Sequence, residues 1–347
     1  MTLEEIRAVD PSGMFDLLGS FPAQIREAVA IGNEARIPPF SRGIRNIVLC
    51  GLGGSAIGGD LLRTYLAGDL KVPFLVNRMY TLPAFVGKET LVIVSSYSGN
   101  TEETNAAHRE ALKRKARILC ITSGGRTAKL AGRGPLIRVP GGLPPRAALG
   151  YSFFPLLISL AKAGFIRERS KATGETIALL DRLAGIYAVP DPATNAALRY
   201  AESLRGRIGV IYSGTERFDS VNTRWRGQIA ENGKALAFGH VIPEMNHNEL
   251  VGWKALREPM REIQVFILRD RGDHRRVRIR MDVTKQVLGE HTSRITEVWS
   301  EGSSLLARMF SLVYLGDWVS LYLAVLHGID PTPVAVIDRL KQELADA

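Results

Sequence analysis

Two turns combine glycines with hydroxyl side chains in a pattern that could bind an anion. The first is GLGGSAIGGD at 51–60, and the second is SSYSGNTEET at 95–104. Each follows a short apolar run and precedes a segment of helical character, as at a junction between a β-strand and an α-helix. Backbone N–H groups at the start of a helix attract anions. Because Ser55, Ser96, Ser98 and Thr101 add side-chain donors, the two turns predict a site for one terminal phosphate group.

The first turn also fits the dinucleotide fingerprint G-x-G-x-x-A, through Gly51, Gly53 and Ala56. A dinucleotide fold requires an acidic residue at the end of its second strand. Here the second strand is expected to end at Asn77-Arg78, where only Arg78 could suit a phosphorylated ribose. A dinucleotide also does not require a second hydroxyl-rich turn. A sugar phosphate is therefore favoured, and a dinucleotide oxidoreductase and two tight turns without a ligand stay as alternatives.

Apolar runs that alternate with helical stretches are expected to position these turns. The expected strands of the first half are 46–50, 73–77, 91–95, 118–122 and 136–139. Their runs are continuous rather than alternating, which is typical of parallel sheets covered on both faces. A second α/β pattern starts with a strand at 208–212, and further strands are expected at 262–268 and 295–299. We therefore predict an α/β fold of two doubly wound domains, each with a mainly parallel sheet flanked by helices.

The expected organisation is an N-terminal helical segment at 1–40, a first domain at 41–188 and a second domain at 189–347. A chain of 347 residues is long enough for two such cores. The second domain repeats the first weakly, with a turn of its own at Ser213-Gly214-Thr215. Whether that turn binds anything stays open.

Composition narrows the function classes. The chain is 46% hydrophobic and 23% charged, as in soluble globular proteins, and we find no secretory signal. The apolar run at 305–326 contains Arg308 and Asp317, so we expect a buried helix and no membrane span. Cys50 and Cys120 lie in apolar runs, which predicts reduced thiols and a cytoplasmic location.

The net charge of +10 could favour nucleic acid or an anionic substrate. The densest basic run, at 269–280, is interrupted by acidic residues and has no interleaved aromatic residues. Such a run is unlike a platform for single-stranded nucleic acid. We therefore expect a solvated edge or loop and no nucleic-acid partner.

The two turns, with Gly53-Gly54-Ser55 in the first, resemble those of the sugar isomerase (SIS) domain, which bind the phosphate of a phosphosugar. Other motifs narrow the resemblance. These are PRAALGY at 145–151, ENGK at 231–234, PEMNHNELVGW at 243–253 and DPTPV at 330–334, followed by IDRLK at 337–341. Over residues 40–345 the chain resembles the bifunctional phosphoglucose/phosphomannose isomerases. The resemblance implies interconversion of glucose 6-phosphate and mannose 6-phosphate with fructose 6-phosphate through an enediol, without a cofactor or metal.

The resemblance also implies catalytic roles. Glu231 corresponds to the family's proton-transferring base. His247 corresponds to the histidine that opens the sugar ring and reaches the active site from the neighbouring subunit, which implies a homodimer. Lys341, on the last helix, corresponds to the family's C-terminal lysine, which assists ring opening or binds a sugar hydroxyl. We expect Ile337 and Leu340 to lie on the buried face of that helix. The C-terminal helix is accordingly expected to return to the active site.

Two further residues are assigned to the sugar. Arg146 follows two prolines, and a guanidinium held in a stiff turn could stabilise the enediolate oxygens. Thr332 belongs to the Asp-Pro-Thr-Pro turn and is expected to help determine tolerance of the two epimers. With Gly54, Ser55, Ser96, Ser98 and Thr101 as phosphate ligands, these complete the predicted site for a hexose 6-phosphate.

Three further alternatives remain open from the residues. An isomerase for another phosphosugar would share the turns. A non-catalytic phosphosugar-binding regulator would keep the turns but would not need Glu231 and His247. Glu244, His247 and Glu249 could also be imagined as metal ligands, although the chain has no complete zinc-ligand motif.

Overall fold

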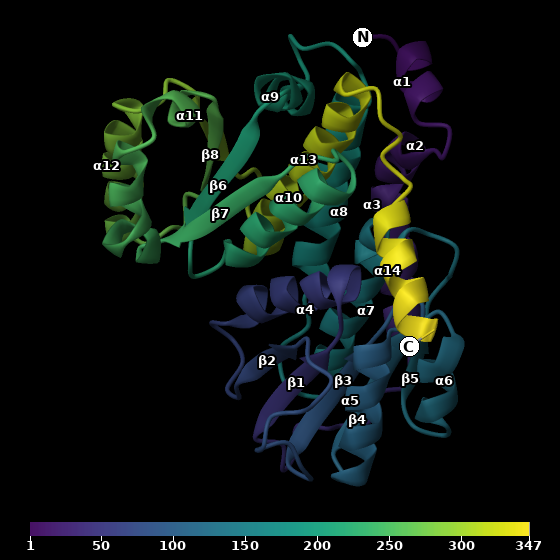
Figure 1. Ribbon diagram of the computed structural model, residues 1–347. Coiled ribbons are helices and arrows are strands. Elements are labelled where there is room, and N and C mark those ends of the chain that lie inside the picture. Colours follow the sequence, from purple (N-terminus) through teal and green to yellow (C-terminus); the bar gives the residue numbers. More distant parts are fainter. Residues whose placement is uncertain (347) are drawn as a thin grey trace. The chain divides into compact units, whose positions relative to one another are not determined.

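The computed structural model describes the backbone of residues 1–346 and the side chains through Leu344. The described chain forms two compact units (Figure 1). One unit comprises Ser20–Asp181 and Gly302–Met309 and contains a five-stranded sheet, and we call it the five-stranded unit. The other comprises Met1–Gly19, Arg182–Glu301 and the chain from Phe310 onward, and contains a four-stranded sheet. We call it the four-stranded unit.

The sheet of the five-stranded unit has the order β2-β1-β3-β4-β5, and all its strand pairs are parallel. Its strands are β1 (Asn46–Cys50), β2 (Phe74–Asn77), β3 (Thr90–Ser95), β4 (Arg117–Thr122) and β5 (Leu136–Arg138). The five strands predicted here are confirmed to within one residue at either end. The central strand β3 is buried along its whole length, because helices cover both faces of a parallel sheet of this kind.

One helix of the five-stranded unit precedes its first strand, and the others come after β1, β3, β4 and β5. They are α3 (Phe21–Glu34), α4 (Gly53–Leu66), α5 (Glu102–Lys113), α6 (Gly125–Ala131), the 3-10 helix η1 (Pro145–Ala147), α7 (Leu149–Lys162) and the first part of α8 (Ser170–Tyr187).

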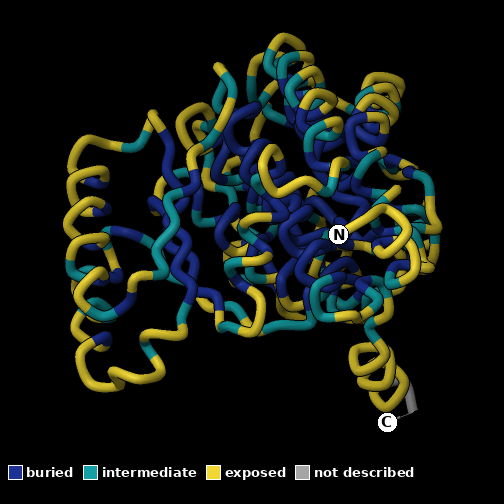
Figure 2. The backbone as a smooth tube through the Cα atoms, turned by 90° about the horizontal axis from the view of Figure 1, so that it is seen from above, coloured by how far each residue is buried: buried dark blue, intermediate teal, exposed yellow. Residues whose placement is uncertain are grey.

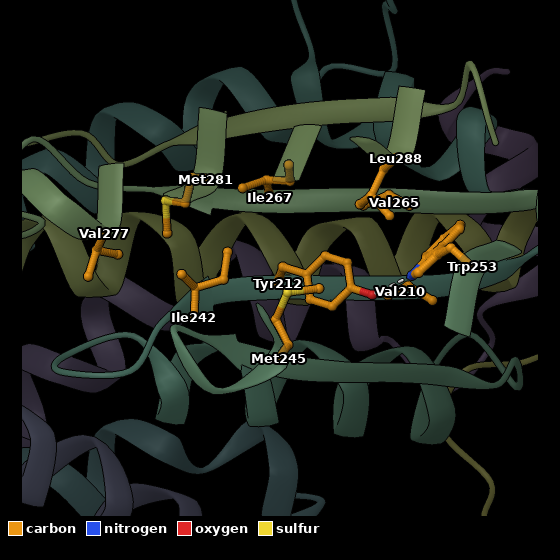
Figure 3. Close-up of a cluster of buried hydrophobic side chains, with 10 residues drawn as sticks. All are labelled: Val210, Tyr212, Ile242, Met245, Trp253, Val265, Ile267, Val277, Met281 and Leu288. Atoms are coloured by element: carbon orange, nitrogen blue, oxygen red, sulfur yellow. Dashed lines mark hydrogen bonds between the residues drawn. The ribbon is translucent and has the colours of Figure 1, made fainter. Parts of the chain in front are cut away.

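The sheet of the four-stranded unit has the order β7-β6-β8-β9 and is also parallel throughout. Its strands are β6 (Ile208–Gly214), β7 (Ala237–Ile242), β8 (Ile263–Arg269) and β9 (Ile295–Trp299). The predicted strands at 208–212, 262–268 and 295–299 are confirmed, whereas β7 was not predicted. One face of this sheet packs against a cluster of buried side chains that includes Tyr212, Met245 and Trp253 (Figure 3).

The helices of the four-stranded unit include two that precede the chain's first strand. The unit's helical segments are α1 (Leu3–Val9), α2 (Met14–Gly19), α9 (Ala196–Leu204), α10 (Asp219–Glu231), η2 (Glu244–His247), η3 (Glu249–Lys254), α11 (Arg257–Arg261), α12 (Arg275–Gly289), most of α13 (Leu305–Leu326) and α14 (Ala335–Asp346). The helical segment predicted at 1–40 is thus divided between units, with α3 in the five-stranded one.

Among the described residues, α13 is the one helix long and apolar enough to cross a membrane, and nearly all of it is buried, as predicted. By contrast, α14 is exposed along most of its length (Figure 2). The predicted fold class is confirmed, with two parallel sheets flanked by helices.

Candidate functional site

The two glycine- and hydroxyl-rich turns lie side by side in the five-stranded unit. They follow β1 and β3, which are hydrogen-bonded neighbours, so both turns leave the same edge of the sheet. The Tyr97 backbone N–H donates to Ser55 Oγ at 3.0 Å, which joins the second turn to the first. Within the second turn, Ser96 Oγ lies 3.0 Å from Thr101 Oγ1. The arrangement brings three of the four predicted phosphate-binding hydroxyls into one small region.

Both turns open directly into helices whose N-termini lack a side-chain cap. Among the described residues, no side chain caps α4 at Leu52 or α5 at Thr101. Ser98, the fourth predicted hydroxyl, is exposed and accepts a bond from the Asn100 N–H at 3.3 Å. Because uncapped N–H groups and the helix dipole both favour negative charge, this edge suits a phosphate.

Two glycines let the backbone pack closely around the turns. Gly99 has a φ of +72°, and a Cβ placed on it would lie 1.9 Å from the Gly124 carbonyl oxygen. A Cβ on Gly54 would lie 2.4 Å from the carbonyl oxygen of Pro145 in η1. The first turn therefore packs directly against the backbone beside Arg146.

Arg146 is buried in η1, next to the first turn. Gln24, from α3, fixes this segment: its Nε2 donates to the Ala147 carbonyl and its Oε1 accepts from the Gly150 N–H, both at 2.8 Å. The predicted stiff turn around Arg146 is therefore present. Gln24 was not predicted. The available signal was a polar residue within the apolar stripe formed by Phe21 and Ala28.

Glu231 is the last residue of α10, in the four-stranded unit. This helix is held against α13 by buried polar contacts. Arg224 donates to the two carboxylate oxygens of Asp317 at 2.9 and 2.7 Å, and Trp225 Nε1 donates to the Leu312 carbonyl at 2.7 Å. Burial raises the pKa of Asp317, and the adjacent Arg224 opposes that shift. Glu231 is therefore half-buried at the end of a firmly fixed helix.

His247 is exposed at the end of η2, after β7. On one side, Met245 inserts into the core cluster (Figure 3). On the other side, Glu249 accepts a hydrogen bond from the buried Tyr212 hydroxyl, and its Oε2 lies 3.0 Å from His240 Nδ1. Burial, and to a smaller extent the bond to the Glu249 carboxylate, raises the pKa of Tyr212. The segment around His247 is thus anchored at both ends while the imidazole faces outward.

The carboxylates near His247 have partners within the protein. Glu244 Oε1 accepts from Asn248 Nδ2 at 3.0 Å, and Glu249 has the contacts just described. In the part of the chain that the structure describes, no three His, Cys, Asp or Glu side chains form a group that could hold a metal ion. The alternative of Glu244, His247 and Glu249 as metal ligands therefore finds no support in the geometry.

Thr332 and Lys341 lie in the C-terminal segment of the four-stranded unit. Thr332 is half-buried, and its N–H donates to Asp330 Oδ1 at 2.9 Å. Lys341 is exposed on α14, with Nζ 3.2 Å from Asp338 Oδ1. The prediction that Ile337 and Leu340 are buried is wrong, because their exposed fractions are 40% and 57%. An amphipathic sequence predicts that the apolar face of a helix packs against another surface, and in this structure that face of α14 is exposed.

The Ser213-Gly214-Thr215 turn occupies the same place in the second sheet as the first turn does in the first sheet. Ser213 Oγ donates to the Phe218 carbonyl at 3.1 Å, and a Cβ on Gly214 would lie 3.1 Å from Asp273 Oδ1. The neighbouring Asp270 is also buried. Burial raises the pKa of Asp273 to about 6. Two carboxylates at this edge disfavour a second phosphate site.

Comparisons with known proteins connect both units to one family. The SIS domain model matches residues 42–129, and the model of the bacterial phospho-glucose isomerase C-terminal SIS domain matches residues 193–344. A protein of Caldicellulosiruptor bescii named bifunctional phosphoglucose/phosphomannose isomerase is 44% identical over 96% of this chain and 99% of its own length. The chain belongs to the bifunctional phosphoglucose/phosphomannose isomerase family. Another relative of that name, from Aquifex aeolicus, is 38% identical over 86% of this chain and 90% of its own.

A solved structure agrees with the fold of this family member. A hypothetical protein from Thermus thermophilus superposes with a TM-score of 0.75, at 16% identity, over 99% of this chain and 94% of its own. At that identity the likeness shows the fold alone.

The predicted site residues of this isomerase-family chain divide between its units. The phosphate-turn residues and Arg146 come together in the five-stranded unit. Glu231, His247, Thr332 and Lys341 belong to the four-stranded unit. In that unit, a lysine that was not predicted as functional, Lys234, links the segments of Glu231 and Thr332. Its side chain donates to the carbonyls of Glu231, Pro331 and Pro333.

Proposed function

We propose that this protein interconverts glucose 6-phosphate and mannose 6-phosphate with fructose 6-phosphate through an enediol. The observation that carries the proposal is the 44% identity, over nearly the full length of both chains, to a protein named bifunctional phosphoglucose/phosphomannose isomerase. The uncapped helix starts and clustered hydroxyls at the edge of the first sheet support it independently, because they suit a sugar phosphate.

The reaction moves one proton between C1 and C2 of the open sugar. A single carboxylate that reaches both carbons can serve both transfers, and we assign this role to Glu231. Its support is the family motif together with the fixed end of α10, which holds the residue's backbone in one place. Glucose and mannose 6-phosphates differ only at C2 and share one enediol, so an enzyme that tolerates both positions of the C2 hydroxyl returns either aldose.

The phosphate and the developing oxyanion need separate ligands. We assign the phosphate to the turn residues Gly54, Ser55, Ser96, Ser98 and Thr101. We assign the charge on the enediolate oxygens to Arg146, because a guanidinium positioned in advance stabilises charge that develops in the transition state. The packing of η1 against Gly54 supports both assignments, since it keeps Arg146 beside the phosphate turns.

Ring opening is assigned to His247 and Lys341. We propose that the protein is a cytoplasmic homodimer in which His247 serves the partner's active site. Three large apolar side chains near His247 in sequence support such an interface, because Phe238, Val251 and Leu256 have exposed fractions of 55%, 82% and 60%.

Cys50 and Cys120 are both buried free thiols, which suits a reducing compartment. We further propose that α14 covers the active site with its apolar face.

The dinucleotide alternative is disfavoured by one contact. Arg78, the residue that could suit a phosphorylated ribose, forms an ion pair with Asp60 in α4. A non-catalytic regulator remains the alternative from another class, and it would need the phosphate turns without the base.

Isotope exchange during turnover tests the proposal. Purified protein is incubated with fructose 6-phosphate in D2O, without added metal or nicotinamide cofactor, and the sugar phosphates are followed by NMR. We expect glucose and mannose 6-phosphates that carry deuterium at C2, because the enediol is reprotonated at that carbon. A folded protein that binds the sugar phosphate but forms neither product would support the regulator and refute the isomerase.

Matched variants test the base and the shared site. Glu231→Gln should abolish turnover and keep binding of a sugar-phosphate analogue, whereas Glu202→Gln, at an exposed position of α9, should behave as wild type. Mixing the inactive Glu231→Gln and His247→Ala proteins should restore part of the activity if each site uses both subunits. Retained turnover in Glu231→Gln would refute its role, and a mixture that stays inactive after subunit exchange would refute the shared site.

Thr332→Gln tests the assignment of epimer tolerance. A longer polar side chain should reduce activity toward one aldose phosphate more than toward the other. Equal losses of both activities would remove Thr332 from this role.

A further inference from the structure

The side chain of Lys234 joins two segments that carry assigned site residues. Its Nζ donates to the Glu231 carbonyl at 2.5 Å, to the Pro331 carbonyl at 3.0 Å and to the Pro333 carbonyl at 2.6 Å. An ammonium has three N–H donors and no acceptor, so these three contacts match its full donor capacity. The carbonyls come from the end of α10 and from the turn that surrounds Thr332.

The backbone at Lys234 adopts a conformation that disfavours a side chain. Its φ is +52°, and the chain has one other non-glycine residue of positive φ among the described residues, Lys115 at +58°. The left-handed conformation is unfavourable for residues with a Cβ, and glycine is the usual choice there. A lysine at such a position indicates that its side chain has a use that a glycine could not serve.

The loop around Lys234 is itself fixed to α13. Asn232 Nδ2 donates to Ser320 Oγ at 3.0 Å, and His327 Nδ1 lies 3.1 Å from the Gly233 carbonyl. A Cβ on Gly233 would lie 2.8 Å from the Ile229 carbonyl oxygen and 2.9 Å from Leu323 Cδ2. The ammonium thus extends from a rigid loop, and it can hold the Pro331–Pro333 turn at a defined place relative to Glu231.

We infer that Lys234 is a positioning residue that sets the place of the Thr332 turn, and of the helix that carries Lys341, relative to the base Glu231. It acts through the backbone carbonyls of both segments and does not transfer a proton itself. The inference rests on the proposed isomerase function for its kinetic consequences. Its structural consequence, the tethering of the C-terminal segment, does not depend on that function.

Two matched glycine variants test the inference. Lys234→Gly removes the ammonium and relieves the positive φ, so loss of the contacts is separated from added backbone strain. Lys115→Gly makes the same chemical change at a similar positive φ, at an exposed position after α5 in the other unit. Lys234→Arg retains a cation that can donate to the carbonyls, and serves as the conservative variant.

The kinetic measurement uses kcat and KM for both aldose phosphates. In Lys234→Gly, kcat should fall by about tenfold to a hundredfold, which is typical when reacting groups are misplaced by up to about 1 Å. The ratio of the two kcat/KM values should change by at least about threefold, because the proposed function assigns the Thr332 turn to the part of the sugar that differs between the epimers. Lys115→Gly should keep wild-type values, and Lys234→Arg should recover most of kcat.

Hydrogen exchange supplies a readout that does not need activity. Amides of α14, including the Ile337 N–H that bonds to the Val334 carbonyl, should exchange faster in Lys234→Gly, while those of α10 before its last turn should not change. If Lys234→Gly does not fold, Lys234→Gln replaces it with the same expected results.

The outcomes separate this inference from the proposed function. An inactive wild type would refute the isomerase, and the exchange result alone would then decide the tether. An active wild type with unchanged kcat, ratio and exchange in Lys234→Gly would overturn the role of Lys234. Equal losses of activity in Lys234→Gly and Lys115→Gly would also overturn it, because the effect would then follow the loss of any lysine at positive φ.

Discussion

Gly54→Ala should damage the site of the five-stranded unit through backbone packing. The new Cβ would lie 2.4 Å from the Pro145 carbonyl oxygen, 2.8 Å from its carbonyl carbon and 3.2 Å from the Arg146 nitrogen. Ordinary van der Waals contact begins near 3.4 Å, so the 3-10 helix η1 and the start of α4 must separate by about 1 Å. Overpacking of this kind costs about 1–3 kcal/mol of unfolding free energy, partly offset because alanine favours a helix over glycine by about 1 kcal/mol.

The effect on activity should exceed the effect on stability. Arg146 and the phosphate turn would move relative to each other by about 1 Å, and a misplacement of that size costs about a hundredfold in rate. We expect Gly54→Ala to keep its fold by circular dichroism, to unfold at slightly lower denaturant, and to lose about a hundredfold in kcat/KM. Gly87→Ala is the control, because a Cβ at that glycine meets nothing within 4 Å. Wild-type kcat/KM in a folded Gly54→Ala protein would refute the reasoning.

Three further predictions concern stability, each measured by denaturant unfolding. Burial lowers the pKa of His108 from 6.5 to about 4. Protonation of the unfolded chain should therefore lower wild-type stability by up to about 3 kcal/mol as pH falls from 6.5 to about 4. His108→Gln should reduce this dependence of stability on pH, and an unchanged dependence would contradict the prediction. Asp273 should have the opposite effect on the pH dependence of stability, because burial raises its pKa from 3.8 to about 6. Stability should fall by about 1–2 kcal/mol as pH rises through this range, after allowance for partial exposure. Asp273→Asn should remove this loss. Asp317→Asn should lower the free energy of unfolding by about 3–5 kcal/mol, because it removes the counter-charge of the buried Arg224. Asp282→Asn, at an exposed position, is the control and should have a much smaller effect. Equal effects of the two variants would refute this prediction.

The positions of most strands were readable from the sequence, because parallel strands buried on both faces leave continuous apolar runs. Leu91–Val94 is such a run and is wholly buried in β3. β7 escaped prediction for the corresponding reason. It lies at the edge of its sheet, most of its residues are half-buried, and Phe238 is exposed. Edge strands can carry fewer apolar residues, and in β7 Gly239 and His240 interrupt the apolar run on which the search depended.

In the candidate site, too, some features were readable from the local sequence and others were not. The two glycine- and hydroxyl-rich turns were readable as local structure because their residues are close in sequence; their role in phosphate binding stays a prediction. Gln24 and Lys234 were not recognised, because their partners are 123 and 97 residues away, at Ala147 and Pro331. Local pattern cannot predict such pairs, since a polar residue with a distant partner looks the same in sequence as a solvated one.

The two sheets show why the fold alone does not locate the site. β1 and β6 hold equivalent positions in their sheets, and each has one parallel neighbour on either side. At the first edge the chain places several glycines and hydroxyls at the starts of α4 and α5, which suits an anion. At the second edge it places Asp270 and Asp273, and the Ser213 hydroxyl bonds to its own loop. The same backbone arrangement therefore suits a phosphate at the first edge and disfavours one at the second, and the difference comes from the side chains rather than from the topology.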